Sequence, residues 1–216
     1  MSLFTFLLVV LGWIFSLCLH EYAHARVAYA GGDVSVRAKG YLSFNPLRYT
    51  DPVYSILMPL VFLLLGGIGL PGGAVYIETW RLRGPRWRTA VSLAGPAANL
   101  LLVPVLAGLI RIVPGEFGPG LAFLGYLQVM AVLFNLLPIP PLDGYGALRP
   151  HLEPGLGIRL DRAGRWAIWV LFAVLWFVDP VADAFWGLVS HIALTLGIPL
   201  DLAAEGYRQM MAITRI

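Results

Sequence analysis

This 216-residue sequence is poor in charged residues and contains a single cysteine. Only 12% of its residues are Asp, Glu, Lys or Arg, which is about half the share in soluble domains, whereas 59% are hydrophobic. Disordered chains and nucleic-acid-binding proteins need many charges, and disulfide-stapled secreted domains need several cysteines, so these classes are excluded. The composition excludes a soluble globular protein as well and predicts an integral membrane protein.

Six apolar segments are candidates for helices in a bilayer, which takes about 20 residues to cross. They are residues 3–30, 52–70, 89–113, 121–137, 166–178 and 181–198. The first segment lacks the basic start and the small-residue cleavage site of a signal peptide, so we expect a retained transmembrane helix. We expect a single membrane-embedded domain over residues 1–216, with a catalytic core (1–150) and accessory helices with a C-terminal tail (151–216).

Two stretches outside these segments have the composition of short strands. Residues 34–44 (VSVRAKGYLSF) and 72–77 (GGAVYI) are rich in β-branched and aromatic residues and are flanked by glycine or proline. Residues 52–70 contain prolines and glycines that interrupt a helix, which predicts a re-entrant or interfacial segment. Residues 200–216 are predicted to form an amphipathic helix on the membrane surface. The expected fold is an all-α polytopic membrane protein with a core of three transmembrane helices, a re-entrant segment with short β-strands and a C-terminal helix pair.

An HExxH sequence, His20-Glu21-Tyr22-Ala23-His24, lies inside the first apolar segment. On a helix its two histidines share one face about 5–6 Å apart, so that both can reach one Zn²⁺. Glu21 is not a ligand in this pattern but the base that takes a proton from the attacking water. Ionisable residues within a membrane helix are costly and mark functional sites, although polar pairing between helices is an alternative. The motif therefore predicts a zinc site on this helix.

A catalytic zinc usually has three protein ligands, so a third must come from elsewhere in the chain. The candidates are His151, His191 and the acids near apolar segments. Asp143 stands out because the apolar segment before it breaks into three prolines between residues 138 and 141. Proline ends a helix, and irregular backbone of this kind can turn a carboxylate toward a cavity. Asp143 is alternatively the N-cap of a helix that starts near Gly144, but a zinc site that lacks one ligand favours the ligand role.

Three stretches, in this order, resemble the site-2 protease family of intramembrane zinc metalloproteases. The HExxH sequence is the first, residues 94–99 (AGPAAN) match the family's glycine-proline-x-x-asparagine motif, and residues 135–144 (NLLPIPPLDG) match its asparagine-x-x-proline-x-proline-x-leucine-aspartate-glycine motif. Residues 45–52 also look like the asparagine-proline segment of compact members, with Tyr-Thr in place of the usual His-Ile. No stretch is long or polar enough for a PDZ or CBS domain.

The resemblance implies that His20, His24 and Asp143 bind one Zn²⁺ and that Glu21 is catalytic. It also implies a set of residues beside the site that support it or bind substrate: Gly95, Pro96, Asn99 and Asn135. The implied activity is that of a metalloendopeptidase that cleaves transmembrane segments of single-pass membrane proteins in the lipid bilayer, known as regulated intramembrane proteolysis. The sequence does not identify the substrate or the oligomeric state, a homo-oligomer included.

The requirement that the three motifs meet constrains the topology. The three motifs lie at the same depth in the membrane only if residues 89–113 run opposite to residues 3–30 and 121–137. The chain between residues 30 and 89 then begins and ends on the same face of the membrane. Every Lys and Arg except Arg111 then lies on the motif side. The positive-inside rule accordingly places the active site near the cytoplasmic face of the cell membrane.

Two functions follow from different interpretations of these residues. In a protease, zinc polarises the scissile carbonyl, Glu21 transfers the proton, Asn135 is a candidate oxyanion donor, and the substrate adds as an extended strand to residues 72–77. The alternative is a non-catalytic membrane metal-binding protein or transporter. A transporter needs ionisable residues along a path through the bilayer, which this sequence supplies mostly at helix ends, and a pseudoprotease would lack a ligand or the base.

Overall fold

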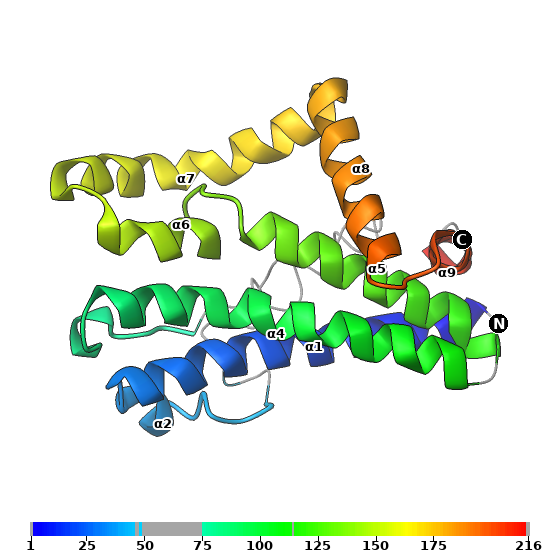
Figure 1. Ribbon diagram of the computed structural model, residues 1–216, viewed down its shortest axis with the longest axis horizontal. Coiled ribbons are helices and arrows are strands. Elements are labelled where there is room, and N and C mark those ends of the chain that lie inside the picture. The colour runs from blue at the N-terminus through cyan, green and yellow to red at the C-terminus, as the bar shows by residue number, and fades with distance from the viewer. Residues whose placement is uncertain (1, 46–47, 49–74, 114, 215–216) are drawn as a thin grey trace.

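The structure, a computed structural model, describes residues 2–45, 48, 75–113 and 115–214. All regular structure within these residues is helical (Figure 1). The α-helices are α1 (Ser2–Gly31), α2 (Ser35–Ala38), α4 (Pro85–Ile112), α5 (Gly118–Asn135), α6 (Asp143–Leu148), α7 (Pro154–Phe177), α8 (Asp179–Thr195) and α9 (Leu200–Thr214). Three short 3₁₀-helices join them: η3 (Thr79–Arg81), η4 (Gly115–Phe117) and η5 (Arg149–His151).

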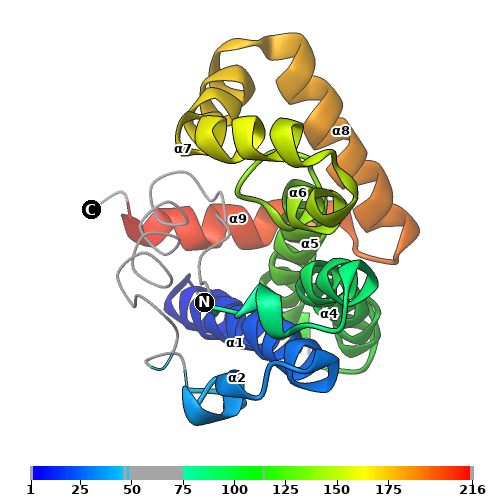
Figure 2. The ribbon, with the colours of Figure 1, turned by 90° about the vertical axis from the view of Figure 1, so that its left-hand side faces the viewer.

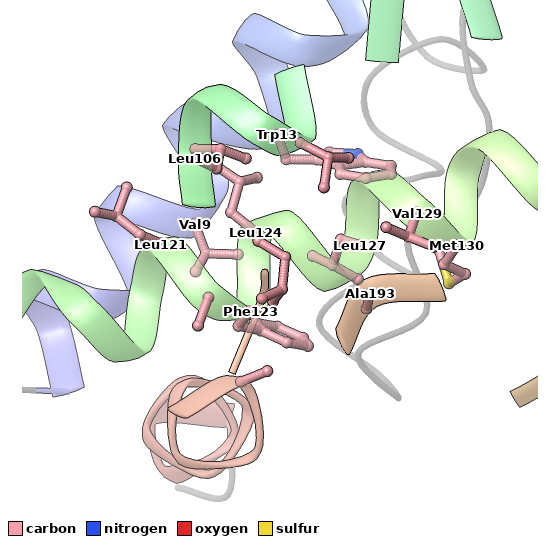
Figure 3. Close-up of a cluster of buried hydrophobic side chains, with 14 of the residues drawn as sticks. Val9, Trp13, Leu106, Leu121, Phe123, Leu124, Leu127, Val129, Met130 and Ala193 are labelled. Carbon is pink, nitrogen blue, oxygen red and sulfur yellow. The ribbon is translucent and has the colours of Figure 1, made fainter. Parts of the chain in front are cut away.

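The core of the molecule is formed by α1, α4 and α5. This agrees with the predicted core of three helices long and apolar enough to cross a membrane. Three stretches of the described chain are long and apolar enough to cross a membrane: Leu3–Gly31, Pro85–Ile112 and Gly115–Asn135. Because α5 is apolar on all sides, it lies in the middle and packs against α1, α4, α8 and α9. Figure 3 shows the buried side chains that join these helices, among them Val9, Trp13, Leu106 and Leu127.

The direction of α4 is opposite to that of α1 and α5 (Figure 1). The amide N of Arg83, just before α4, donates to the carbonyl of Gly31 at the end of α1 over 3.0 Å. The Arg83 guanidinium also lies 5.0 Å from the ring centre of Trp87. The connection between the two helices therefore begins and ends at one end of the bundle, as the meeting of the three motifs requires. The predicted re-entrant segment, residues 52–70, lies outside the described residues.

The prediction of a strand over residues 34–44 is wrong, because side-chain bonds start a helical turn there. Asp33 Oδ1 accepts from the Ser35 amide at 3.0 Å and from the Ser35 hydroxyl at 2.6 Å, at the start of α2. Gly40, at φ +77°, follows the helix in a conformation that favours glycine. Residues 75–78 have no regular structure, and residues 72–74 lie outside the described part. A strand needs a backbone partner, whereas these residues bond to side chains, as set out below.

The predicted C-terminal helix pair is present as α7 and α8, but the two helices form one bent path. They meet at an angle of 93° around Val178, where Pro180 at the start of α8 cannot continue the preceding helix. The beginning of α7 is fixed by Glu153, whose carboxylate accepts from two amides of the first turn. A side chain at Gly197, just after α8, would touch Arg111 at the end of α4. The pair thus leads from the histidine end of the bundle to the opposite end.

Helix α9 confirms the predicted C-terminal amphipathic helix and corrects its position. It is seen end-on in Figure 1 and lengthwise in Figure 2, so it runs across the core helices. Its buried residues, including Met210, pack on α5 and α1, and Gln209 Oε1 accepts from the Thr5 hydroxyl at 2.5 Å. Thr5 lies at the start of α1, so Arg208 sits at the end opposite to the histidines. The prediction that only Arg111 lies there is wrong, because α7 and α8 return the chain to that end once.

Candidate metal centre

Two histidines of α1 and one aspartate of α6 converge on a single point. The Nε2 atoms of His20 and His24 lie 3.0 Å apart, as expected for two residues one helical turn from each other. Asp143 approaches with Oδ2 at 3.2 Å from His20 Nε2 and with Oδ1 at 3.4 Å from His24 Nε2. Among the described residues this is the one group of three or more His, Cys, Asp or Glu side chains whose ligand atoms are gathered in this way.

The three side chains fit a zinc ion in number, chemistry and spacing. Ligand atoms about 2.0–2.2 Å from a tetrahedral Zn²⁺ lie about 3.3–3.5 Å from one another. The distances of 3.0, 3.2 and 3.4 Å between the Nε2 and carboxylate atoms are close to this range. Two imidazoles and one carboxylate are also the donor set of catalytic zinc sites, in which a fourth position is left for water or substrate.

The tautomer and orientation of His24 are set by the backbone of α4. His24 Nδ1 lies 2.6 Å from the carbonyl oxygen of Val91, which can only accept, so Nδ1 donates. Nε2 then carries the lone pair that can bind a metal, and Asp143 Oδ1 lies 3.4 Å from it. A hydrogen bond of this kind fixes the ring and increases the basicity of a metal-binding histidine.

Gly95 permits α4 to pass directly over the two histidines. A Cβ at this position would overlap with Nε2 of both His20 and His24. Asn99, one turn further along α4, is buried in the same region, and its Oδ1 has no hydrogen-bond partner among the described atoms. Pro96 is buried in α4 and does not line the cavity around the site. The glycine of the GPxxN motif is thus explained by space, whereas its proline is not part of the cavity wall.

Asp143 reaches the histidines because the chain folds back tightly after α5. A Cβ at Gly144 would collide with the carbonyl oxygens of Leu136 and Leu137, so only glycine allows α6 to start this close to the end of α5. Asp143 is the first residue of α6, and the N-cap position is occupied by Leu142. The Asp143 carboxylate is turned to the histidines, so the alternative role of Asp143 as an N-cap is wrong.

Glu21 is buried beside the histidines, and its carboxylate contacts a segment distant in sequence. Its Oε2 accepts a hydrogen bond from the amide of Val75 at 3.0 Å. This contact could not be predicted, because a backbone amide leaves no signature in the sequence. The same holds for the carbonyl of Val91.

A cavity of about 880 Å³ gathers the predicted site residues. Its lining includes the three converging side chains and Glu21, Asn99 and Asn135. Parts of α1, α4, α5, α6, α7 and residues 75–82 form the rest of the wall: Trp13, Ser16, Val75, Ile77, Thr79, Leu82, Ser92, Ala131, Tyr145, Ile158, Asp161 and Ile168. The cavity is open to the outside and has both polar and apolar walls. It is large enough for a stretch of peptide beside the three side chains.

The other two histidines lie apart from this centre. His151 is exposed, and its Nε2 lies 2.9 Å from the hydroxyl of Thr89. His191 is exposed on α8. Neither belongs to a group of ligating side chains within the described chain.

A further polar cluster at the rim of the cavity was not predicted. Arg149 binds both carboxylate oxygens of Asp161, with Nε at 3.1 and 3.0 Å, and the Tyr145 hydroxyl donates to Asp161 Oδ1 at 2.5 Å. Burial and the neighbouring Asp161 raise the pKa of Tyr145 to about 12. The cluster ties α7 to α6, two residues after Asp143. No spacing rule connects these three residues, because they come from different elements.

Comparison with known proteins finds relatives over most of the chain. The protein named "Putative zinc metalloprotease Rip2" of Mycolicibacterium smegmatis is 48% identical over 187 residues, which cover 82% of this chain and 72% of the relative. The Mycobacterium tuberculosis protein of the same name is 44% identical over 206 residues, which cover 93% of this chain and 78% of the relative. YwhC of Bacillus subtilis, which carries the same description as a zinc metalloprotease, is 33% identical over 206 residues and 88% of each chain. None of the family models searched matches the chain, and none of the solved structures does.

Proposed function

Because this chain belongs to the site-2 protease family of zinc metalloproteases, we propose that it hydrolyses peptide bonds within the transmembrane segments of single-pass membrane proteins. The observation that carries the proposal is the convergence of His20, His24 and Asp143 beside the buried Glu21, inside a bundle of apolar helices. Ionisable side chains inside a membrane bundle have a free-energy cost, so such a group indicates a functional site. A metalloendopeptidase accounts for every member of the group.

His20, His24 and Asp143 would hold one Zn²⁺. When bound, the ion supplies a Lewis acid that polarises the scissile carbonyl and makes water a stronger acid. The bond from His24 to the Val91 carbonyl keeps this ligand oriented, and the space at Gly95 keeps α4 clear of the ligand atoms.

Glu21 is the proton carrier in the proposed reaction. Its carboxylate lines the same cavity, so it can take a proton from the attacking water and pass it to the leaving amine. Asn135, at the end of α5, lines the cavity as well and can donate its amide hydrogens to the developing oxyanion. Asn99 has a free Oδ1 on the α4 side, which suits a substrate amide hydrogen.

We place the site near the cytoplasmic face of the cell membrane. The described basic residues gather at the histidine end of the bundle, on the connection between α1 and α4, at the start of α4, on η5, and in the first half of α7. Arg111 and Arg208 lie at the opposite end. An excess of Lys and Arg is typical of cytoplasmic ends, which supports this orientation in the bilayer.

The backbone of residues 75–77 is the proposed docking edge for an unfolded stretch of substrate. Val75 and Ile77 line the cavity, and the Val75 amide already faces Glu21. Helical substrate hides its carbonyl groups in its own hydrogen bonds, so it must be held in an extended form. Main-chain bonds to an edge do this with little demand on sequence.

Substitution of Ile77 by proline is expected to reduce cleavage about tenfold, since one main-chain hydrogen bond of the docking edge is lost. Zinc content should stay at the wild-type level, because Ile77 is not one of the three proposed ligands. The matched control is Ile77→Ala, which shortens the side chain but keeps the N–H. Ile77→Pro cleaving as fast as Ile77→Ala would disprove the docking edge.

The proposed function is tested with purified protein in proteoliposomes that also contain one of a panel of tagged single-pass membrane proteins. We expect fragments whose new ends lie within the transmembrane segment, formed by the wild type and not by the Glu21→Gln variant. Zinc binding without cleavage of any member of a broad panel would favour the non-catalytic metal-binding alternative. Fragments whose ends lie only outside the membrane would contradict intramembrane cleavage.

A further inference from the structure

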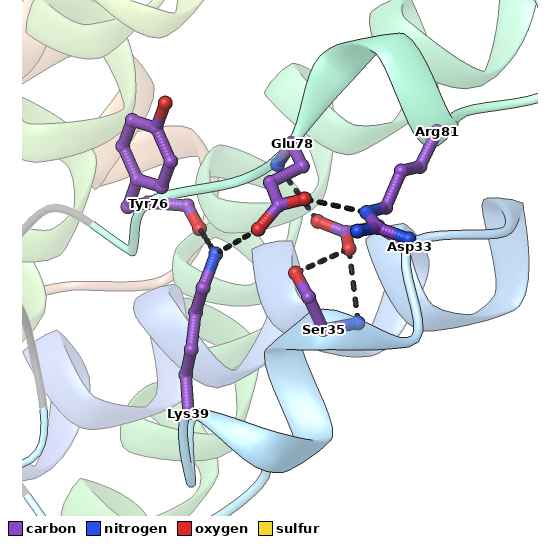
Figure 4. A network of polar contacts seen from close by, with 6 residues as sticks. All are labelled: Asp33, Ser35, Lys39, Tyr76, Glu78 and Arg81. Carbon is purple, nitrogen blue, oxygen red and sulfur yellow. Dashed lines mark hydrogen bonds and ion pairs between the residues drawn. The ribbon is translucent and has the colours of Figure 1, made fainter.

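A network of polar side chains beside the site holds residues 75–78 against the end of α1 (Figure 4). We call this the anchor network; it consists of Asp33, Ser35, Lys39, Tyr76, Glu78 and Arg81. It joins the connection between α1 and α2 to the chain that leads into η3. None of its members belongs to the converging group of His20, His24 and Asp143.

Asp33 is the buried centre of the anchor network. Its side chain has no exposed surface, and three donors satisfy its two carboxylate oxygens. Oδ1 accepts from the amide and hydroxyl of Ser35, and Oδ2 accepts from the amide of Glu78 at 2.8 Å. A buried carboxylate needs such donors, since an unsatisfied one is costly. The bond to Glu78 therefore fixes the backbone at that residue.

Lys39 and Arg81 complete the network on the solvent side. Lys39 Nζ donates to the Tyr76 carbonyl at 3.2 Å and to Glu78 Oε1 at 2.9 Å, and it lies 4.8 Å from the centre of the Tyr76 ring. Arg81 Nε donates to Glu78 Oε2 at 2.5 Å. The hydrogen bonds from Arg81 and Lys39 lower the pKa of Glu78 to about 2. Glu78 is therefore ionised near neutral pH, and the network is intact there.

The bonds of this segment alternate in direction along the chain. The Val75 amide points to Glu21, whereas the Tyr76 carbonyl and the Glu78 amide point to Lys39 and Asp33. Alternation with a period of two is the pattern of an extended chain. The same alternation predicts that the Ile77 backbone groups face the side of Glu21, and both Val75 and Ile77 line the cavity. The anchor network holds one edge of the segment and leaves the other edge to the site.

We propose that Asp33, Lys39 and Glu78 are positioning residues that set the register of residues 75–78 and thereby decide which substrate bond reaches the metal centre. The inference rests on the proposed intramembrane protease activity and on docking along this segment. A strand that pairs with an edge is fixed by the register of that edge, because equivalent pairings recur every second residue. The hydrogen bond from the Glu78 amide to Asp33 therefore determines which substrate bond is cut.

The contacts of the segment favour this role over general stabilisation. Within the described residues, the Val75 amide bonds to Glu21 and the Tyr76 carbonyl bonds to Lys39, and residues 75–77 belong to no helix or sheet. Without the anchor network, the hydrogen bond from the Val75 amide to Glu21 would be the remaining polar contact between the described residues 75–77 and the helical core. The segment would then be free to shift along the site while the ligands stay in place.

The test compares Asp33→Asn, Lys39→Met and Glu78→Gln with the wild type in proteoliposomes, on a single-pass substrate that the wild type cleaves. Product ends are determined by mass spectrometry, KM and kcat are measured separately, and zinc content and thermal midpoint are recorded. We expect a rise in KM of about tenfold, since a charged hydrogen bond is lost, and new cut sites two residues from the wild-type site. Zinc content should stay unchanged. Lys39 and Glu78 are partly exposed, so these two variants keep the test valid if Asp33→Asn fails to fold.

The matched control is Glu205→Gln, which breaks an ion pair of similar type at the opposite end of the bundle. It should leave KM and the cut site unchanged. A double-mutant cycle of Lys39 and Glu78 should be non-additive in KM, because both act through one contact. Anchor variants that cut the same bond with the wild-type KM would overturn the inference while the protease function stands. Failure of the protease function itself would appear in the wild type, as equal product from wild type and Glu21→Gln.

Discussion

Glu21→Gln is expected to reduce peptide-bond cleavage by about 10²–10⁴-fold while zinc stays bound, since this is the usual contribution of a positioned general base. Glutamine has nearly the same size as glutamate, and its carbonyl oxygen can still accept from the Val75 amide, as Glu21 Oε2 does at 3.0 Å. What is lost is the ability to take a proton from water and return it to the leaving amine. The substitution therefore removes one chemical step and preserves the local contacts.

The measurement combines the initial rate of cleavage in proteoliposomes with metal analysis of the purified protein. Glu205→Gln is the matched control, because it is the same chemical change on a partly exposed residue at the far end of the bundle. We expect wild-type rates from it. Cleavage by Glu21→Gln at a rate similar to the wild type would refute the role of Glu21 as the base. Loss of zinc in this variant would instead show that Glu21 supports the ligands.

Gly95→Ala is expected to lower zinc content and cleavage together, by about 10–100-fold, as is common when residues around a metal site are changed. A Cβ at this position would overlap with Nε2 of both His20 and His24. The rings can turn away, or α4 can move outward. Either change separates the ligand atoms from Asp143, and a shift of α4 also breaks the bond between His24 and the Val91 carbonyl.

The matched control for Gly95→Ala is Gly108→Ala, in the same helix. A Cβ at Gly108 would meet no atom within 4 Å, so the same substitution has space there. Both variants gain the same small preference for helix, of about 1 kcal/mol. Zinc content and cleavage should therefore fall in Gly95→Ala alone. Full zinc content in Gly95→Ala would mean that the close approach of α4 to the histidines is not needed for binding.

Local patterns in the sequence predicted the helices and the converging side chains. The helices α1, α4 and α5 can be predicted from their long apolar runs, because a helix that crosses a bilayer requires about 20 apolar residues. The proximity of His20 and His24 can be predicted because both lie on one helix, whose geometry is fixed by hydrogen bonds between residues four apart. Asp143 was predicted from the prolines before it, because proline ends a helix.

Patterns of composition failed where single side-chain bonds decide the local structure. Residues 34–44 have strand-like composition, but the Asp33 carboxylate bonds to the amide and hydroxyl of Ser35 at the start of a helical turn. β-Propensity depends on a partner strand, and among the described residues this stretch has none. Arg208 was placed at the wrong end because the 93° bend between α7 and α8 is not evident from two apolar segments.

By itself, the sequence determined that this is a membrane protein with a histidine pair, a neighbouring glutamate and one distant aspartate suited to zinc. These features depend on composition and on spacing within a helix, which neighbours in the chain control. The tertiary structure decided how the groups from different helices meet: Gly95 over the histidines, Val75 on Glu21, and Asp33 on the Glu78 amide. Such contacts depend on the crossing and register of packed elements, which follow from the fit of many side chains at once. No motif in the chain encodes that fit.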